Sequence, residues 1–124
     1  MYQKILVGTD GSPTAARAVD RAVQVAKATD ARLTILMAGR PDRARNVVEA
    51  AAARHADSGV AIDTRVVDTD PVSALVETAE ADGYDLVVTG NRGMTGLTRF
   101  FSIGSVPNKL SHHLPTSLLI VKTT

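Results

Sequence analysis

Short apolar runs alternate with segments of helical periodicity along the 124 residues of the chain. Most of these runs are apolar at successive positions, which is typical of parallel strands whose two faces are both covered by helices. The third run alternates more between apolar and polar positions, which indicates a strand at an edge of the sheet. We predict five strands, at residues 5–7, 33–37, 60–67, 86–89 and 118–121.

Helix start and stop residues separate the predicted strands. An N-cap side chain precedes a proline at Ser12-Pro13 and again at Asp70-Pro71. Proline is favourable at the first helical position because its missing N–H would have no partner there. The predicted helices begin at Pro13, Pro41, Pro71 and Ser105. The last three are expected to end near Gly59, Gly83 and Pro115, respectively.

Alternation of strands and helices predicts an α/β fold with an open, doubly wound parallel sheet and helices on both faces. The length suits one Rossmann-like domain over residues 1–124. In such sheets ligands bind beyond the carboxyl ends of the strands, where the strand order reverses. The strand ends that would face this crevice are residues 8–10, 37–39, 67–68 and 89–90.

Composition narrows the classes of function. Apolar residues make up 44% of the chain, which suits a packed core, and 14 basic against 13 acidic residues leave a net charge of +1. This balance gives no reason to expect nucleic acid or a membrane as a partner. The sequence has no cysteine, which excludes disulfides, thiolate catalysis and cysteine-based zinc sites. Because no signal peptide and no apolar run of ~20 residues is recognised, we expect a cytoplasmic location.

The segment at residues 90–105 is the candidate for ligand chemistry because it connects a predicted strand to a helix and is long for such a connection. Its glycines can expose backbone N–H groups as a nest for anions, and Ser105 adds a hydroxyl where a helix begins. Arg92 and Arg99 would neutralise a polyphosphate. Taken alone, the segment equally fits a glycine-rich loop with two solvated arginines. The glycines are Gly90, Gly93, Gly96 and Gly104.

Two motifs together resemble the universal stress protein family. They are Gly90-x2-Gly93 followed by Gly104-Ser105, and the turn Gly8-Thr-Asp-Gly-Ser12 after the first strand. The resemblance spans nearly the whole chain and implies an adenine-nucleotide-binding fold with five parallel strands in the order 3-2-1-4-5. It also implies that Asp10 approaches the ribose and the backbone of Ala38 the adenine. Phosphates would be held by Gly90, Gly93, Gly104 and Ser105, in a pocket lined further by Gly8, Thr9, Arg92 and Val106.

The chain departs from the family pattern in two places. ATP-binding members place nine residues between the second and third glycines, whereas ten, residues 94–103, intervene here. The connection after the second strand, around residues 38–41, is shorter than is usual in the family. If the extra residue bulges within residues 98–102, the nest survives, whereas a rotation of Gly104-Ser105 would lower the affinity for a triphosphate. The short connection points to a more open or weaker site.

The sequence therefore predicts a stress-response or signalling module that binds ATP, AMP or cAMP, with Mg²⁺ bridging the phosphates if the ligand is ATP. No catalytic residue is expected, and ATP hydrolysis would be weak at most, because neither a general base nor a P-loop lysine is evident. The alternative is a dimeric interaction protein that has lost nucleotide binding. A phospho-acceptor domain is disfavoured because one acidic residue, Asp10, ends the first strand where a receiver domain needs a pair.

The fifth predicted strand, at residues 118–121, is apolar throughout. At an edge it would invite association unless it were covered, so we expect a homodimer through this strand, which the family resemblance also implies. No metal site is expected. Neighbouring side chains on a helix point in different directions, so His112-His113 are interpreted as structural or solvated, and His55 in the same way. Phe100-Phe101 could cover an adenine, but we favour a role in anchoring the loop to the core.

Overall fold

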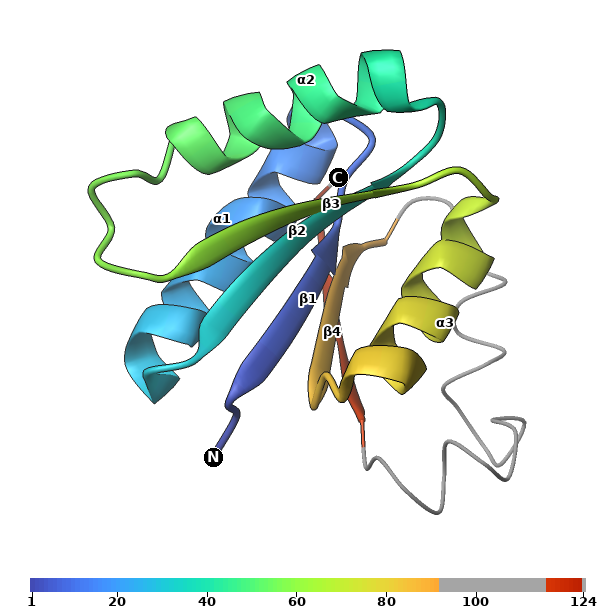
Figure 1. Cartoon of the computed structure of the whole chain (residues 1–124). Coiled ribbons are helices and arrows are strands. Elements are labelled where there is room, and N and C mark those ends of the chain that lie inside the picture. Colours follow the sequence, from blue (N-terminus) through green and yellow to red (C-terminus); the bar gives the residue numbers. More distant parts are fainter. Residues whose placement is uncertain (92–115, 124) are drawn as a thin grey trace.

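The computed structural model describes residues 1–91 and 116–123, which form five parallel strands and three helices (Figure 1). The elements are β1 (Lys4–Gly8), α1 (Pro13–Thr29), β2 (Arg32–Ala38), α2 (Pro41–Ala53), β3 (Ile62–Val67), α3 (Pro71–Asp82), β4 (Leu86–Gly90) and β5 (Ser117–Val121). The strand order β3-β2-β1-β4-β5 confirms the predicted sheet and places β3 and β5 at its edges. The helix predicted from Ser105 lies outside the described residues.

Helices cover both faces of the sheet, as the apolar strands predicted. Successive residues of β1 point to opposite faces, and Ile5, Leu6 and Val7 are all fully buried. Ile5 and Val7 belong to a cluster that includes Val19 of α1 and Val48 of α2. Leu6 belongs to a second cluster with residues of α3. The sheet is therefore the middle layer, with α1 and α2 on one face and α3 on the other (Figure 1).

The N-caps predicted from the sequence are present. The Ser12 Oγ accepts a hydrogen bond from the Ala15 N–H at 3.1 Å, and the Asp70 carboxylate accepts one from the Ser73 N–H at 2.9 Å. Gly83, with a φ of 73°, ends α3 in the left-handed conformation that favours glycine. The first turns of α1 and α3 are thus fixed by side-chain caps.

Helix α2 ends at Ala53, earlier than the expected end near Gly59. Beyond Ala53 the backbone continues as tight turns, in which the His55 N–H donates to the Ala52 carbonyl and the Ala56 N–H to the Ala53 carbonyl. Gly59, with a φ of +83°, lies in the connection to β3 instead. The helical pattern in the sequence therefore continues beyond the residue at which α2 ends.

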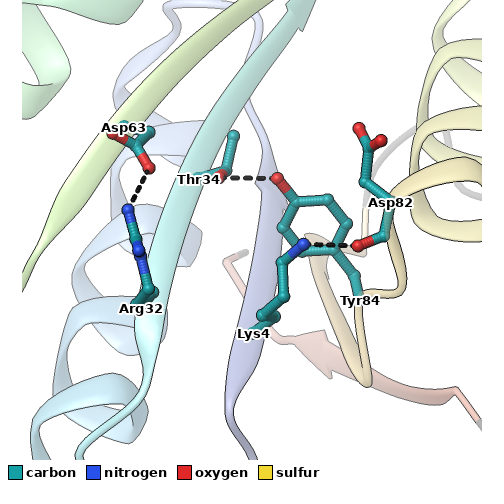
Figure 2. A network of polar contacts seen from close by, with 6 residues as sticks. All are labelled: Lys4, Arg32, Thr34, Asp63, Asp82 and Tyr84. Atoms are coloured by element: carbon teal, nitrogen blue, oxygen red, sulfur yellow. Dashed lines mark hydrogen bonds and ion pairs between the residues drawn. The ribbon is translucent and has the colours of Figure 1, made fainter.

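A polar network holds the end of α3 to the amino ends of the strands, far from the carboxyl ends where ligands bind (Figure 2). The Lys4 ammonium donates to the Asp82 carbonyl and lies 4.6 Å from the centre of the Tyr84 ring. The Tyr84 hydroxyl donates to the Thr34 Oγ1 at 2.8 Å, and both side chains are buried. The Arg65 guanidinium pairs with the Asp82 carboxylate, which raises the pKa of Arg65. These contacts anchor the C-terminal end of α3 near the amino ends of the strands. The first turn of α3 is therefore held at the carboxyl ends of the strands.

The cap of α3 should make stability depend on pH. The Ser73 backbone N–H, together with the Ser73 side chain, holds the pKa of Asp70 below its ordinary value of 3.8. A carboxylate with a lowered folded-state pKa stabilises the fold fully above its unfolded-state pKa, and the effect is lost as the pH falls through the folded-state value. The Asp70→Asn variant keeps an acceptor for the cap but does not titrate.

Urea unfolding of both proteins from about pH 6 to about pH 2 measures this contribution. Below pH 3.8 the wild type should lose more free energy of unfolding than Asp70→Asn does. Identical pH profiles would show that protonation of Asp70 does not change the free energy of unfolding.

Candidate functional site

A pocket of about 570 Å³ opens at the carboxyl end of the sheet, between β1 and β4. The chain runs from β1 outward to β2 and β3 and then returns to the other side of β1 as β4. The pocket thus lies at the point where the strand order reverses, which is where ligands bind in doubly wound sheets. Its walls come from the ends of β1, β2 and β4, the first turns of α1 and α3, and the residue Thr123 beyond β5.

The turn between β1 and α1 forms the mouth of the pocket and is built from local hydrogen bonds. The Thr9 N–H donates to the Leu36 carbonyl at 2.9 Å, and the Thr9 Oγ1 accepts from the Gly11 N–H at 3.1 Å. The Asp10 carboxylate accepts from the Ser12 N–H at 2.9 Å. Asp10 therefore has the turn-forming role that its neighbours suggest, and it lines the pocket as well.

One wall of the pocket is apolar. Leu36 and Ala38 contribute from the end of β2, and Val72 and Leu75 contribute from α3. Leu75 packs so closely on β1 that a Cβ built on Gly8 would lie 3.1 Å from the Leu75 Cδ1. A side chain at Gly8 would therefore require the Leu75 side chain to shift by a few tenths of an ångström.

The opposite wall is polar and small. It is formed by Thr89 and Gly90 at the end of β4, by Thr123, and by the hydroxyls of Ser12 and Thr14 at the start of α1. The two hydroxyls lie 3.1 Å apart. The N-termini of α1 and α3 both reach the pocket, so that the positive ends of two helix dipoles face it.

The structure brings together every predicted site residue that it describes. These residues, which all line the pocket, are Gly8, Thr9, Asp10, Ala38 and Gly90. The other predicted residues lie outside the described residues and are Arg92, Gly93, Gly104, Ser105 and Val106. The predicted short connection after β2 is present, since only Gly39 and Arg40 separate β2 from α2.

Sequence reasoning missed several residues that line the pocket. From the sequence, Ser12 is predicted as an N-cap and as the end of the family turn but not as a pocket residue, and Thr14 carries no prediction. Val72 and Leu75 fall on the apolar stripe of the helix predicted from Pro71, which is typical of core residues. Thr123 follows β5, whose carboxyl end lies at the same edge of the parallel sheet as the carboxyl ends of the other strands. The rule that ligands bind beyond these strand ends could therefore have included Thr123.

No metal centre is found in the part of the chain that the structure describes, where no three histidine, aspartate or glutamate side chains gather. The His55 Nε2 lies 2.9 Å from the Asp20 carboxylate and so links the end of α2 to α1, in line with its structural interpretation. His112-His113 and Phe100-Phe101 lie outside the described residues. None of the helices described is long and apolar enough to cross a membrane.

The fold defines a doubly wound α/β protein with a pocket at its topological switch point. The profile of the universal stress protein family matches residues 1–50 and 36–122. Universal stress protein YxiE of Bacillus subtilis is 32% identical over 149 aligned positions, which cover 98% of this chain and 100% of the relative. Universal stress protein Rv1636 of Mycobacterium tuberculosis is 34% identical, over 99% of this chain and 98% of the relative.

Solved structures agree with this match. The crystal structure of a universal stress protein in complex with cAMP superposes with a TM-score of 0.77 at 40% identity, covering 99% of this chain and 98% of that one. The chain belongs to the universal stress protein family. Gly8, Thr9, Asp10, Ser12 and Gly90, which belong to the two motifs that resemble the family, all line the pocket at the switch point of the sheet.

The comparison also locates a difference between this chain and its relatives. The alignment with YxiE needs 149 positions for a chain of 124 residues, so the relative has residues that this chain lacks. The two segments matched by the family profile overlap at residues 36–50, which include the short connection between β2 and α2. The family profile therefore changes from one matched segment to the other in the region of the short connection between β2 and α2.

Alanine substitutions of the strand-end glycines Gly8 and Gly90 should distinguish a glycine that is tightly packed from one that only lines the pocket. In Gly8→Ala the new methyl group meets the Leu75 side chain at 3.1 Å, and such overpacking typically costs about 1–3 kcal/mol of stability. In Gly90→Ala the nearest atom is the Thr123 Cγ2 at 3.4 Å, an ordinary contact, and neither glycine has a positive φ. Gly90→Ala should therefore change stability by no more than about 0.5 kcal/mol.

Urea denaturation of the two variants and the wild type measures both effects. Equal destabilisation by the two substitutions would contradict the close packing of Leu75 on Gly8. A Gly8→Ala/Leu75→Val double variant, which shortens the opposing side chain, should recover part of the stability that Gly8→Ala loses.

Proposed function

We propose that this universal stress protein binds an adenine nucleotide, with cAMP as the first candidate, in the pocket between β1 and β4. In this proposal residues 1–124 act as one nucleotide-binding domain of a stress-response or signalling module. The observation that carries the proposal is that Asp10 lines one pocket together with apolar side chains of β2 and α3 and with the first turns of α1 and α3.

The apolar wall suits a planar base. An adenine ring needs flat apolar surfaces and a few fixed polar groups for orientation. The side chains of Leu36, Val72 and Leu75 supply the apolar surface. The backbone of Ala38, at the end of β2, supplies polar groups beside it. The short connection to α2 leaves this side of the pocket with little chain above it, in agreement with a base that is only partly covered.

The polar part of the pocket suits the ribose and the phosphate. A carboxylate accepts hydrogen bonds from hydroxyl groups, so Asp10 is the ribose-binding group in this proposal. The first turns of α1 and α3 favour an anion through their dipoles. The remaining phosphate ligands of the proposal are Gly90, Gly93, Gly104 and Ser105, with Arg92 and Val106 alongside, and all but Gly90 lie outside the described residues.

The relative of known structure in complex with cAMP supports the choice of nucleotide. It is 40% identical to this chain over nearly its full length. AMP and ATP contain the same base and sugar and differ in the number and attachment of phosphates. They are therefore the comparison ligands, ATP both with and without Mg²⁺.

Calorimetric titration of cAMP into wild type, Asp10→Asn and Asp57→Asn tests this proposal. Asn keeps the acceptor for the Ser12 N–H but removes the charge, so Asp10→Asn should fold normally and bind about tenfold more weakly. Asp57 is an exposed residue beyond α2 that does not line the pocket, and Asp57→Asn removes the same charge as a control. Absence of binding by the folded wild type to cAMP, AMP and ATP would refute the proposal.

A second candidate function is a dimeric interaction protein without a nucleotide ligand. Strand β5 pairs with β4 on one side, and among the described residues no strand covers its other side. Ile120 in this strand is 41% exposed and, with Met1, is one of two large apolar side chains that are exposed among the described residues. We propose that two copies associate through this strand, whether or not nucleotide binds.

Replacement of Ile120 by lysine should weaken such an association, because a charged side chain on an edge strand opposes strand pairing. The position is exposed, so Ile120→Lys should leave the fold intact. Light scattering coupled to gel filtration should give a dimer for the wild type and a monomer for the variant. A monomeric wild type would contradict the proposed association.

A further inference from the structure

Thr123 is buried beyond the end of β5, and all of its backbone and side-chain polar groups are held by residues distant in sequence. Its N–H and its hydroxyl both donate to the Asn91 Oδ1, at 3.1 and 2.8 Å. Its carbonyl accepts from the Arg17 Nη1 at 2.9 Å. Only 3% of Thr123 is exposed, although the residue lines the pocket. Two side chains, one from α1 and one from the end of β4, thus fix this part of the pocket wall.

The orientation of the Asn91 side chain follows from these bonds. A backbone N–H can only donate, so the atom of Asn91 that faces Thr123 is the carbonyl oxygen. With its N–H and hydroxyl hydrogens both directed to Asn91, Thr123 presents a methyl group and an acceptor oxygen to its surroundings. Thr123 can therefore act as a spacer, or its hydroxyl oxygen can accept a hydrogen bond from a ligand donor such as a hydroxyl group. It has no hydrogen left to donate to a phosphate oxygen.

The same contacts set the spacing of two residues in the polar wall of the pocket, Gly90 and Thr123. Asn91 directly follows Gly90, and a Cβ built on Gly90 would lie 3.4 Å from the Thr123 Cγ2. Neither Asn91 nor Arg17 lines the pocket, whereas Gly90 and Thr123 both do. Arg17 extends the connection to α1, the helix whose first turn forms the mouth of the site.

We infer that Arg17 and Asn91 are positioning residues, which hold Thr123 against Gly90 and so shape the nucleotide pocket without contacting the ligand. This inference rests on the proposed function for the identity of the ligand. It adds to that proposal a way in which an exposed residue of α1 affects affinity. The geometry on which it depends exists in the protein without ligand and can be measured there.

Three variants of α1 test the role of Arg17. Arg17→Met keeps the aliphatic stem and removes the donor to the Thr123 carbonyl, whereas Arg17→Lys keeps a donor. Arg21→Met makes the same charge change one turn along the same helix, at an exposed residue that does not line the pocket. Methionine and lysine are comparable helix formers, so helix propensity stays constant.

Calorimetry with cAMP should show about tenfold weaker binding for Arg17→Met, because the free variant would hold the binding-competent wall only about one-tenth of the time. Arg17→Lys and Arg21→Met should bind close to the wild type. Equal weakening by Arg17→Met and Arg21→Met would mean that only charge matters and would overturn the inference. Unchanged binding by Arg17→Met would overturn it as well.

Amide resonances of the ligand-free proteins separate this inference from the proposed function. Arg17→Met and Asn91→Leu, which removes the shared acceptor, should both shift the resonances of Gly90 and Thr123, while Arg21→Met should not. If the wild type binds no nucleotide, the proposed function fails, and these shifts still support the positioning role. Unmoved Gly90 and Thr123 resonances in both variants would overturn the role whatever the ligand.

Discussion

Burial of the central strand β1 on both faces is the constraint on which the structure depends. Ile5, Leu6 and Val7 are fully buried, and each such side chain contributes roughly 1.5–3 kcal/mol relative to exposure. Their alternating directions require helices on both sides of the sheet, which α1 and α2 supply on one face and α3 on the other. The packing of Leu75 on Gly8 completes this arrangement at the carboxyl end of the strand.

The site follows from that packing. The turn from Gly8 to Ser12 leaves the sheet where the strand order reverses, and its backbone is fixed by Thr9 and Asp10. The polar network around Lys4, Asp82 and Tyr84 fixes α3 at the other end of the sheet, so that the first turn of α3 faces the same opening (Figure 2). Stability and site geometry therefore depend on the same contacts of the central strand and α3.

Much of the fold could be predicted from the sequence because the signals are local. The runs that became β1, β2 and β4 are apolar at successive positions, and the caps at Ser12 and Asp70 stand directly before the helices that they begin. The end of α2 could not be predicted, since the alanine-rich periodicity continues past Ala53, where the backbone changes to tight turns. The site was predictable at Gly8 to Asp10 from the strand-end rule and the family motif. The role of Thr123 was not, because it depends on contacts with Asn91 and Arg17, which are remote in sequence.

The central claim is that the pocket between β1 and β4 is the nucleotide site, and a crystal structure of the chain grown with saturating cAMP tests it most directly. The account predicts nucleotide density in this pocket, with the ribose at the Asp10 carboxylate and the base against Leu36 and Val72. An empty pocket in a correctly folded chain, or cAMP bound elsewhere on the molecule, would contradict the account.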